Sequence, residues 1–145
     1  MEQKADRFTS VYHRPELSDR AVVLVQDLES ALQGETVRLT IRGCRIWLSA
    51  HNDVVWESVL ATAGYGEPAS WWEPRIFEGD QLPNAFAIFL LGLLFLADVE
   101  LHCPARDITL TTSHDEWLEL SAGEEAAFEQ FESRFAAAEL PRWKR

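Results

Sequence analysis

The sequence predicts a single α+β domain in which an antiparallel sheet of about four to six strands packs against about three or four helices. The chain has 145 residues, a usual length for one domain, so residues 1–145 are expected to fold together. Its hydrophobic and aromatic fractions, 47% and 11%, are typical of a chain that folds around a core. Segments of alternating polarity and segments of helical period both occur, which indicates strands as well as helices.

The N-terminal part is expected to hold an extended segment followed by a helix. Residues 1–17 have no regular polarity pattern. Ser18 suits the N-cap of a helix over residues 19–33, whose apolar side chains recur at helical spacing and which Gly34 would end. Because residues 22–25 are rich in valine, a strand at this point is the alternative.

The clearest local pattern predicts a hairpin. Apolar and polar residues alternate over residues 36–41, Gly43 interrupts the pattern, and the alternation resumes over residues 44–48. A short helix is then expected between residues 52 and 64, with a capping Asn or Asp at its start and a glycine at its end.

Residues 64–83 form a long segment rich in glycine, proline and aromatic residues. Loops of this length in compact domains are usually functional or disordered, and the aromatic content argues against disorder. Trp71 and Trp72 are therefore a candidate contact surface, with packing over the core as the alternative. The run that follows is apolar on every side, which predicts a fully buried helix (about 84–97) between the sheet and other helices.

The last third predicts an antiparallel meander and a helix. Three short strands are expected at residues 99–103, 108–112 and 117–120, separated by turn residues. Ser121 and Glu124 have the spacing of a capping box, with the serine as the N-cap. The helix that follows places three phenylalanines on one stripe, namely Phe128, Phe131 and Phe135.

Charge is the feature with the most functional information. The formal net charge is -11, and between residues 115 and 139 eight acidic residues stand against one basic residue, Arg134. Three of the acids, Glu125, Glu129 and Glu132, follow one another at helical spacing and predict a negative flank beside the phenylalanine stripe. Such a flank is either a solvated face or a docking face for a basic partner.

Few residues are arranged as in catalytic or metal sites. The sequence has neither a G-x-S-x-G motif nor paired Cys or His ligands, so no catalytic centre, metal or cofactor is predicted. Cys44 and Cys103 are expected to be buried thiols. Clustered Lys and Arg are scarce, which disfavours nucleic acid. The longest apolar run, residues 85–97, is shorter than the roughly 20 residues that a membrane span requires.

The charged N-terminus resembles neither a secretory signal nor a transit peptide, so a cytoplasmic protein is expected, and the preference for Arg over Lys is typical of GC-rich bacterial genomes. We therefore expect a small acidic binding protein that neutralises a basic protein partner, as bacterial immunity proteins inhibit toxin domains. The expected partner-binding residues are Glu116, Glu119, Glu125, Glu129, Glu132, Trp71 and Trp72.

Two alternatives stay open from the sequence. The first is a small-ligand-binding or enzymatic domain with a pocket under the 64–83 loop, in which His51, His102 or His114 supplies acid/base chemistry. The second is a subunit of a larger assembly, with the aromatic loop buried against a neighbouring chain.

Overall fold

The computed structural model describes residues 6–43, 50–66, 70–95 and 97–143. Over these ranges the chain forms a six-stranded antiparallel sheet in the order β1-β6-β5-β4-β2-β3, together with four α-helices and one short 3-10 helix, η2. The strands are β1 (Phe8–His13), β2 (Val37–Gly43), β3 (Arg75–Phe77), β4 (Asp98–Cys103), β5 (Ile108–Thr112) and β6 (Trp117–Ala122). The helices are α1 (Ser18–Ala31), α2 (Ala50–Thr62), η2 (Gly79–Gln81), α3 (Leu82–Leu94) and α4 (Glu125–Ala137).

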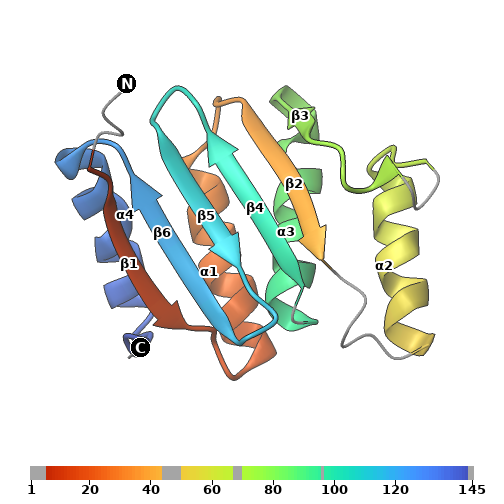
Figure 1. Cartoon of the computed structure of the whole chain (residues 1–145), viewed down its shortest axis with the longest axis horizontal. Helices are drawn as coiled ribbons and strands as arrows, with labels where there is room; N and C mark the ends of the chain where they lie inside the picture. Colours follow the sequence, from red (N-terminus) through yellow and green to blue (C-terminus); the bar gives the residue numbers. More distant parts are fainter. Residues whose placement is uncertain (1–5, 44–49, 67–69, 96, 144–145) are drawn as a thin grey trace.

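The helices are arranged asymmetrically about the sheet. α1, α3 and α4 lie side by side on one side of it, whereas α2 stands next to α3 at the β3 end of the molecule (Figure 1). This arrangement confirms the predicted α+β class.

The core lies between the sheet and this helical layer. One row of directly opposite residues crosses five strands: Ser10, Leu120, Leu110, Leu101 and Leu39. All five are buried, which is the alternation expected of an antiparallel sheet that is covered on one side. The predicted meander is therefore present as β4, β5 and β6. The extended lead-in contains a strand, β1, that pairs with β6.

The apolar helix expected over about 84–97 is α3. Most of its residues are buried, although Ala87 is exposed and Leu90 is half-buried on its outer side. Gly92 allows α3 to lie close to the sheet, because a Cβ at this position would be 2.7 Å from Oγ1 of Thr112 and 2.9 Å from Cγ2 of Val99. That hydroxyl is itself fixed, since it donates a 2.7 Å hydrogen bond to the carbonyl of Ala97.

Other local expectations need adjustment. The first strand of the predicted hairpin is β2, whose described neighbours are β4 and β3, while residues 44–48 lie outside the described residues. The 64–83 segment is partly regular because it contains β3 and η2. The capping-box prediction is wrong. Ser121 stays in β6, opposite Thr9 and Thr109, and α4 begins at Glu125 without a side-chain cap.

Candidate functional site

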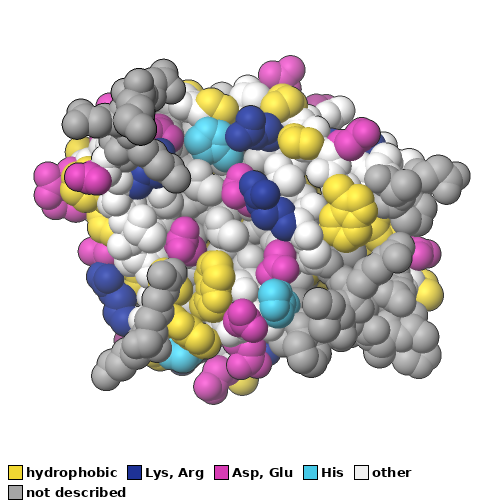
Figure 2. Space-filling model, in the orientation of Figure 1, with side chains coloured by type: hydrophobic (Ala, Val, Ile, Leu, Met, Phe, Trp, Pro, Cys, Tyr) yellow, Lys and Arg dark blue, Asp and Glu magenta, His cyan; other side chains and the backbone are white. Residues whose placement is uncertain are grey.

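The two sides of the sheet differ in cover and in charge. Within the described ranges no helix covers the side opposite α1, α3 and α4, and Figure 2 shows this open side. Basic and acidic side chains are interspersed over it. For example, Nη2 of Arg42 on β2 lies 3.1 Å from Oε2 of Glu100 on β4. This side therefore resembles the solvated face of an ordinary antiparallel sheet.

The acidic residues of α4 point in two directions. Its apolar stripe packs inward on β1 and β6, which leaves Glu125 and Glu129 exposed on the outer side. The ion pairs of α4 are made by Arg134 and Glu132, and within the described ranges neither Glu125 nor Glu129 has one. These two carboxylates are therefore available to a partner.

Glu132 is engaged inside the fold. Its Oε2 accepts hydrogen bonds from the hydroxyls of Ser10, at 3.1 Å, and Tyr12, at 3.4 Å, and from Nη2 of Arg142, at 2.8 Å. These contacts join α4 to β1 and to the C-terminal segment. Burial raises the pKa of the Tyr12 phenol, and the neighbouring Glu132 carboxylate adds to that shift.

The remaining predicted glutamates are not part of α4. Glu119 is opposite Val11 and Thr111, on the open side of the sheet, so the sheet separates it from α4. Glu116 lies in the turn between β5 and β6 with φ 69°, a left-handed conformation, and its carboxylate is 3.7 Å from Nη2 of Arg14. Glu119 therefore does not extend the α4 surface, whereas Glu116 lines a groove together with Glu139, which follows α4.

The aromatic loop packs mainly over the core. Trp71 is 7% exposed, and its Nε1 donates a 3.3 Å hydrogen bond to the carbonyl of Gly66, whereas Trp72 is 39% exposed. Tyr65 and Phe77 are also buried here, and burial raises the pKa of Tyr65 to about 12. Because the loop adjoins β3 and α4 adjoins β1, the predicted contact residues lie at opposite ends of the sheet (Figure 1).

Exposed carboxylates without ion pairs occur mainly in two regions of the described chain. At the β3 end they are Glu57, Glu73, Glu78 and Asp80, and around α1 and α4 they are Glu16, Asp19, Glu124, Glu125, Glu129 and Glu139. In the same region Arg134 is already held by Asp27, with 2.6 Å between Nη1 and Oδ1. The surface around α1 and α4 is therefore more acidic than the open side of the sheet.

A groove that the sequence did not indicate lies between these two helices. It has a volume of about 510 Å³, and its apolar part is formed by Val23, Leu24, Ala137 and Ala138. At Arg20 and Glu139 it adjoins a second groove of about 690 Å³, which reaches the end of β1 and the start of α1. The sequence contained one signal for this groove, because Val23 is an apolar residue that falls outside the apolar face of α1.

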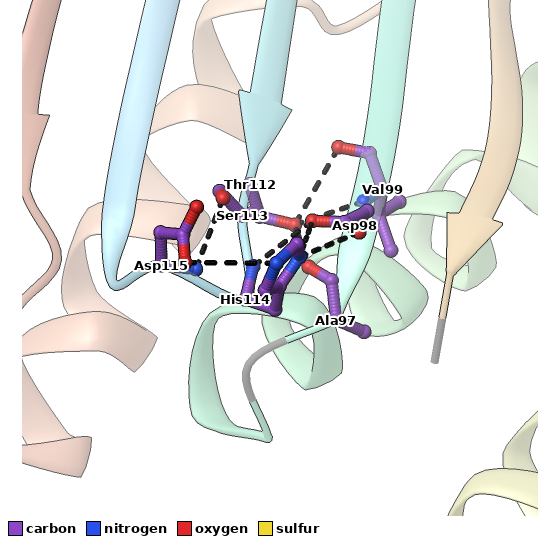
Figure 3. A network of polar contacts seen from close by, with 7 residues as sticks. All are labelled: Ala97, Asp98, Val99, Thr112, Ser113, His114 and Asp115. Atoms are coloured by element: carbon purple, nitrogen blue, oxygen red, sulfur yellow. Dashed lines mark hydrogen bonds and ion pairs between the residues drawn. The ribbon is translucent and has the colours of Figure 1, made fainter. Parts of the chain in front are cut away.

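A polar cluster around Asp98 and His114 lies where β4 begins and β5 ends (Figure 3). Nδ1 of His114 lies 2.9 Å from Oδ1 and 2.8 Å from Oδ2 of Asp98, and the backbone N–H of His114 donates to the same carboxylate. The hydrogen bond to Asp98 raises the pKa of His114. Ser113, the neighbouring hydroxyl, accepts a hydrogen bond from the N–H of Asp115, so its geometry is that of a turn.

The other groups considered for chemistry are dispersed. His102 lies on the open side with Nδ1 2.9 Å from Oγ1 of Thr109, and the side chain of His51 lies outside the described residues. Cys103 is buried and burial raises the pKa of its thiol, while Cys44 lies outside the described residues. Among the residues described, no three His, Cys, Asp or Glu side chains converge as metal ligands.

The comparisons with known proteins add no family. No protein-family model, curated protein or solved structure matches the chain. Within the described ranges, no helix has the length and apolar character needed to cross a membrane.

Proposed function

We propose that this chain is a small acidic binding protein that neutralises a basic protein partner in the bacterial cytoplasm, as an immunity protein inhibits a toxin domain. The observation that carries the proposal is the outer side of α4, where Glu125 and Glu129 are exposed and form no ion pair with any described residue. The acidic rim of α1 enlarges the same surface.

Electrostatics supports a partner of basic character. A net charge of -11 on a chain of this size attracts cations at long range, and complementary fields raise association rates by about 10- to 1000-fold at low ionic strength. Screening limits this attraction to about 8 Å at physiological salt. Binding through α4 should therefore weaken steeply as salt is added.

The test is capture of the tagged protein's partners from its own cell lysate at low salt, with elution by high salt and identification by mass spectrometry. A double variant, Glu125→Lys with Glu129→Lys, should lose most of a basic partner that the unmodified chain retains. The matched control is Glu73→Lys with Asp80→Lys, because both residues are exposed near β3 and the change in net charge is the same.

Two results would contradict the proposal. One is a lysate from which no basic protein is captured in stoichiometric amount; the other is a partner that both double variants lose equally, since that shows an effect of net charge and not of α4. Neutralisation is then measured directly, as growth of cells that express the captured partner with and without this chain.

A further inference from the structure

We propose that the groove between α1 and α4 receives an amphipathic basic segment of the partner, whose aliphatic side chains enter the groove while its Lys or Arg side chains meet the acidic rim. This inference rests on the proposed function and assigns the anchoring site within it. The groove lies at the C-terminal end of α4, beyond the exposed glutamates of its first turns.

The apolar part of the groove gives the reason for an aliphatic anchor. Val23 is 65% exposed on α1, although its neighbour Leu24 is buried in the core. On the facing helix Ala137 is also exposed, and its small side chain leaves room for a side chain of a partner. Grooves of this kind between helices commonly bind the apolar face of an amphipathic segment.

The rim gives the reason for a basic segment. Asp19 and Glu139 line the groove and form no ion pair with any described residue, and Glu16 continues the acidic rim into the adjoining groove. Arg134 is neutralised by Asp27, so Arg20 is the groove cation without an ion pair among the described residues. The charge left after pairing is therefore negative, which favours Lys or Arg over acidic side chains.

The backbone at Glu139 adds an independent observation. This residue follows α4 with φ 57°, in the left-handed region where helices usually end in glycine. A glutamate costs stability there relative to glycine. Glu139 nevertheless lines both grooves.

The experiment measures, at physiological salt, the affinity of two synthetic peptides that have the same length and the same positive charge. One is amphipathic and built from Leu, Lys and Ala; the other replaces each Leu by Gln. We expect the Leu-containing peptide to bind about tenfold more tightly, since each buried aliphatic side chain contributes to affinity. In two-dimensional NMR spectra, it should shift the backbone amides of Val23, Leu24, Ala137 and Ala138 most.

Two pairs of matched variants locate the binding. Val23→Gln should weaken binding of the Leu-containing peptide about tenfold, whereas Val54→Gln, at a valine of α2 that is 62% exposed, should leave it unchanged. Arg20→Gln should strengthen binding about threefold by removing the groove cation, whereas Arg38→Gln on the open side of the sheet should have no such effect. All four residues are exposed, so the variants should fold.

The inference is overturned if the two peptides bind equally, if Val54→Gln weakens binding as much as Val23→Gln, or if the amide shifts map to the outer side of α4. Those results leave the proposed function standing when lysate capture still yields a basic partner that depends on Glu125 and Glu129. The opposite combination, binding in the groove without any captured basic partner, overturns the neutralising role and retains the groove as a peptide site.

Discussion

Replacing Glu132 by alanine should lower the free energy of unfolding by about 2 kcal/mol. The carboxylate accepts hydrogen bonds from two buried hydroxyls, at 3.1 Å from Ser10 and 3.4 Å from Tyr12. Hydrogen bonds to a charged group contribute about 1.5–3 kcal/mol each at good geometry, and the longer of these is weak. The pair with Arg142 is exposed and contributes at most about 1 kcal/mol. The two hydroxyls lie 3.1 Å apart and can bond each other after the change. The loss of stability therefore stays near the lower end of the range for a charged hydrogen bond.

The assay is urea unfolding followed by tryptophan fluorescence, with the slope of the transition checked for constancy. The control is Glu129→Ala, one helical turn earlier on α4, which carries the same change in charge and helix propensity but should cost less than about 0.5 kcal/mol. The expected difference corresponds to a melting temperature lower by about 6 °C for Glu132→Ala. Equal stability of the two variants would refute the structural role of Glu132 and return it to the docking surface.

Three further predictions concern the fold. His114→Gln should cost more stability at about pH 5.5 than at about pH 8.5 in urea unfolding. The bond to Asp98 raises the pKa of His114 in the folded state. The stability that this bond contributes is therefore complete below the ordinary histidine pKa of about 6.5 and is lost as the pH rises through the folded-state pKa. Gly92→Ala should lower the free energy of unfolding by about 1–3 kcal/mol, measured in the same way, because its Cβ meets Thr112, although alanine favours helices by about 1 kcal/mol. Deleting residues 141–145 removes two backbone hydrogen bonds from the outer edge of β1, so light scattering should show more association.

The sequence predicted best those elements whose signals are local. The meander of β4, β5 and β6 combines strict alternation with turns rich in proline and polar residues, and its strands are neighbours in both sequence and space. α1 and α3 carry an apolar pattern that fits a helix. By contrast, β1 pairs with a strand more than a hundred residues later, and β3 has three residues. Neither strand has a local sequence pattern strong enough to predict it.

The capping box failed because tertiary pairing prevailed over a local motif. Ser121 has the spacing of an N-cap relative to Glu124, but the ladder with β1 and β5 keeps it in β6, where its hydroxyl accepts a 2.8 Å hydrogen bond from Nε of Arg7. That bond gives the Ser121 hydroxyl a partner, while α4 begins without a side-chain cap. A motif of four residues could not reveal two strands that pair from distant parts of the chain.

The candidate surface was predicted in part. Strand parity already separated Glu119 from the core-facing Leu118 and Leu120, so its place on the open side could have been deduced from the alternation. The engagement of Glu132 could not, because it depends on hydroxyls of β1 that lie about 120 residues earlier in the chain. A test that reverses Glu132 together with Glu125 and Glu129 would therefore mix unfolding with loss of docking.

The distribution of ion pairs bears on whether the acidity only solvates the protein. On the open side of the sheet, Glu100 is paired with Arg42 and Asp98 with His114. Around α1 and α4, Arg134 is paired with Asp27 and Arg142 with Glu132, while Glu125 and Glu129 form no ion pair with the described residues. Exposed carboxylates without ion pairs also lie near β3, so it is the apolar groove beside the acids, and not their lack of partners, that distinguishes the α1 and α4 layer from a solvated surface. A basic partner that binds this layer would supply the missing counter-charges, and it would bury the exposed face of Val23 at the same time.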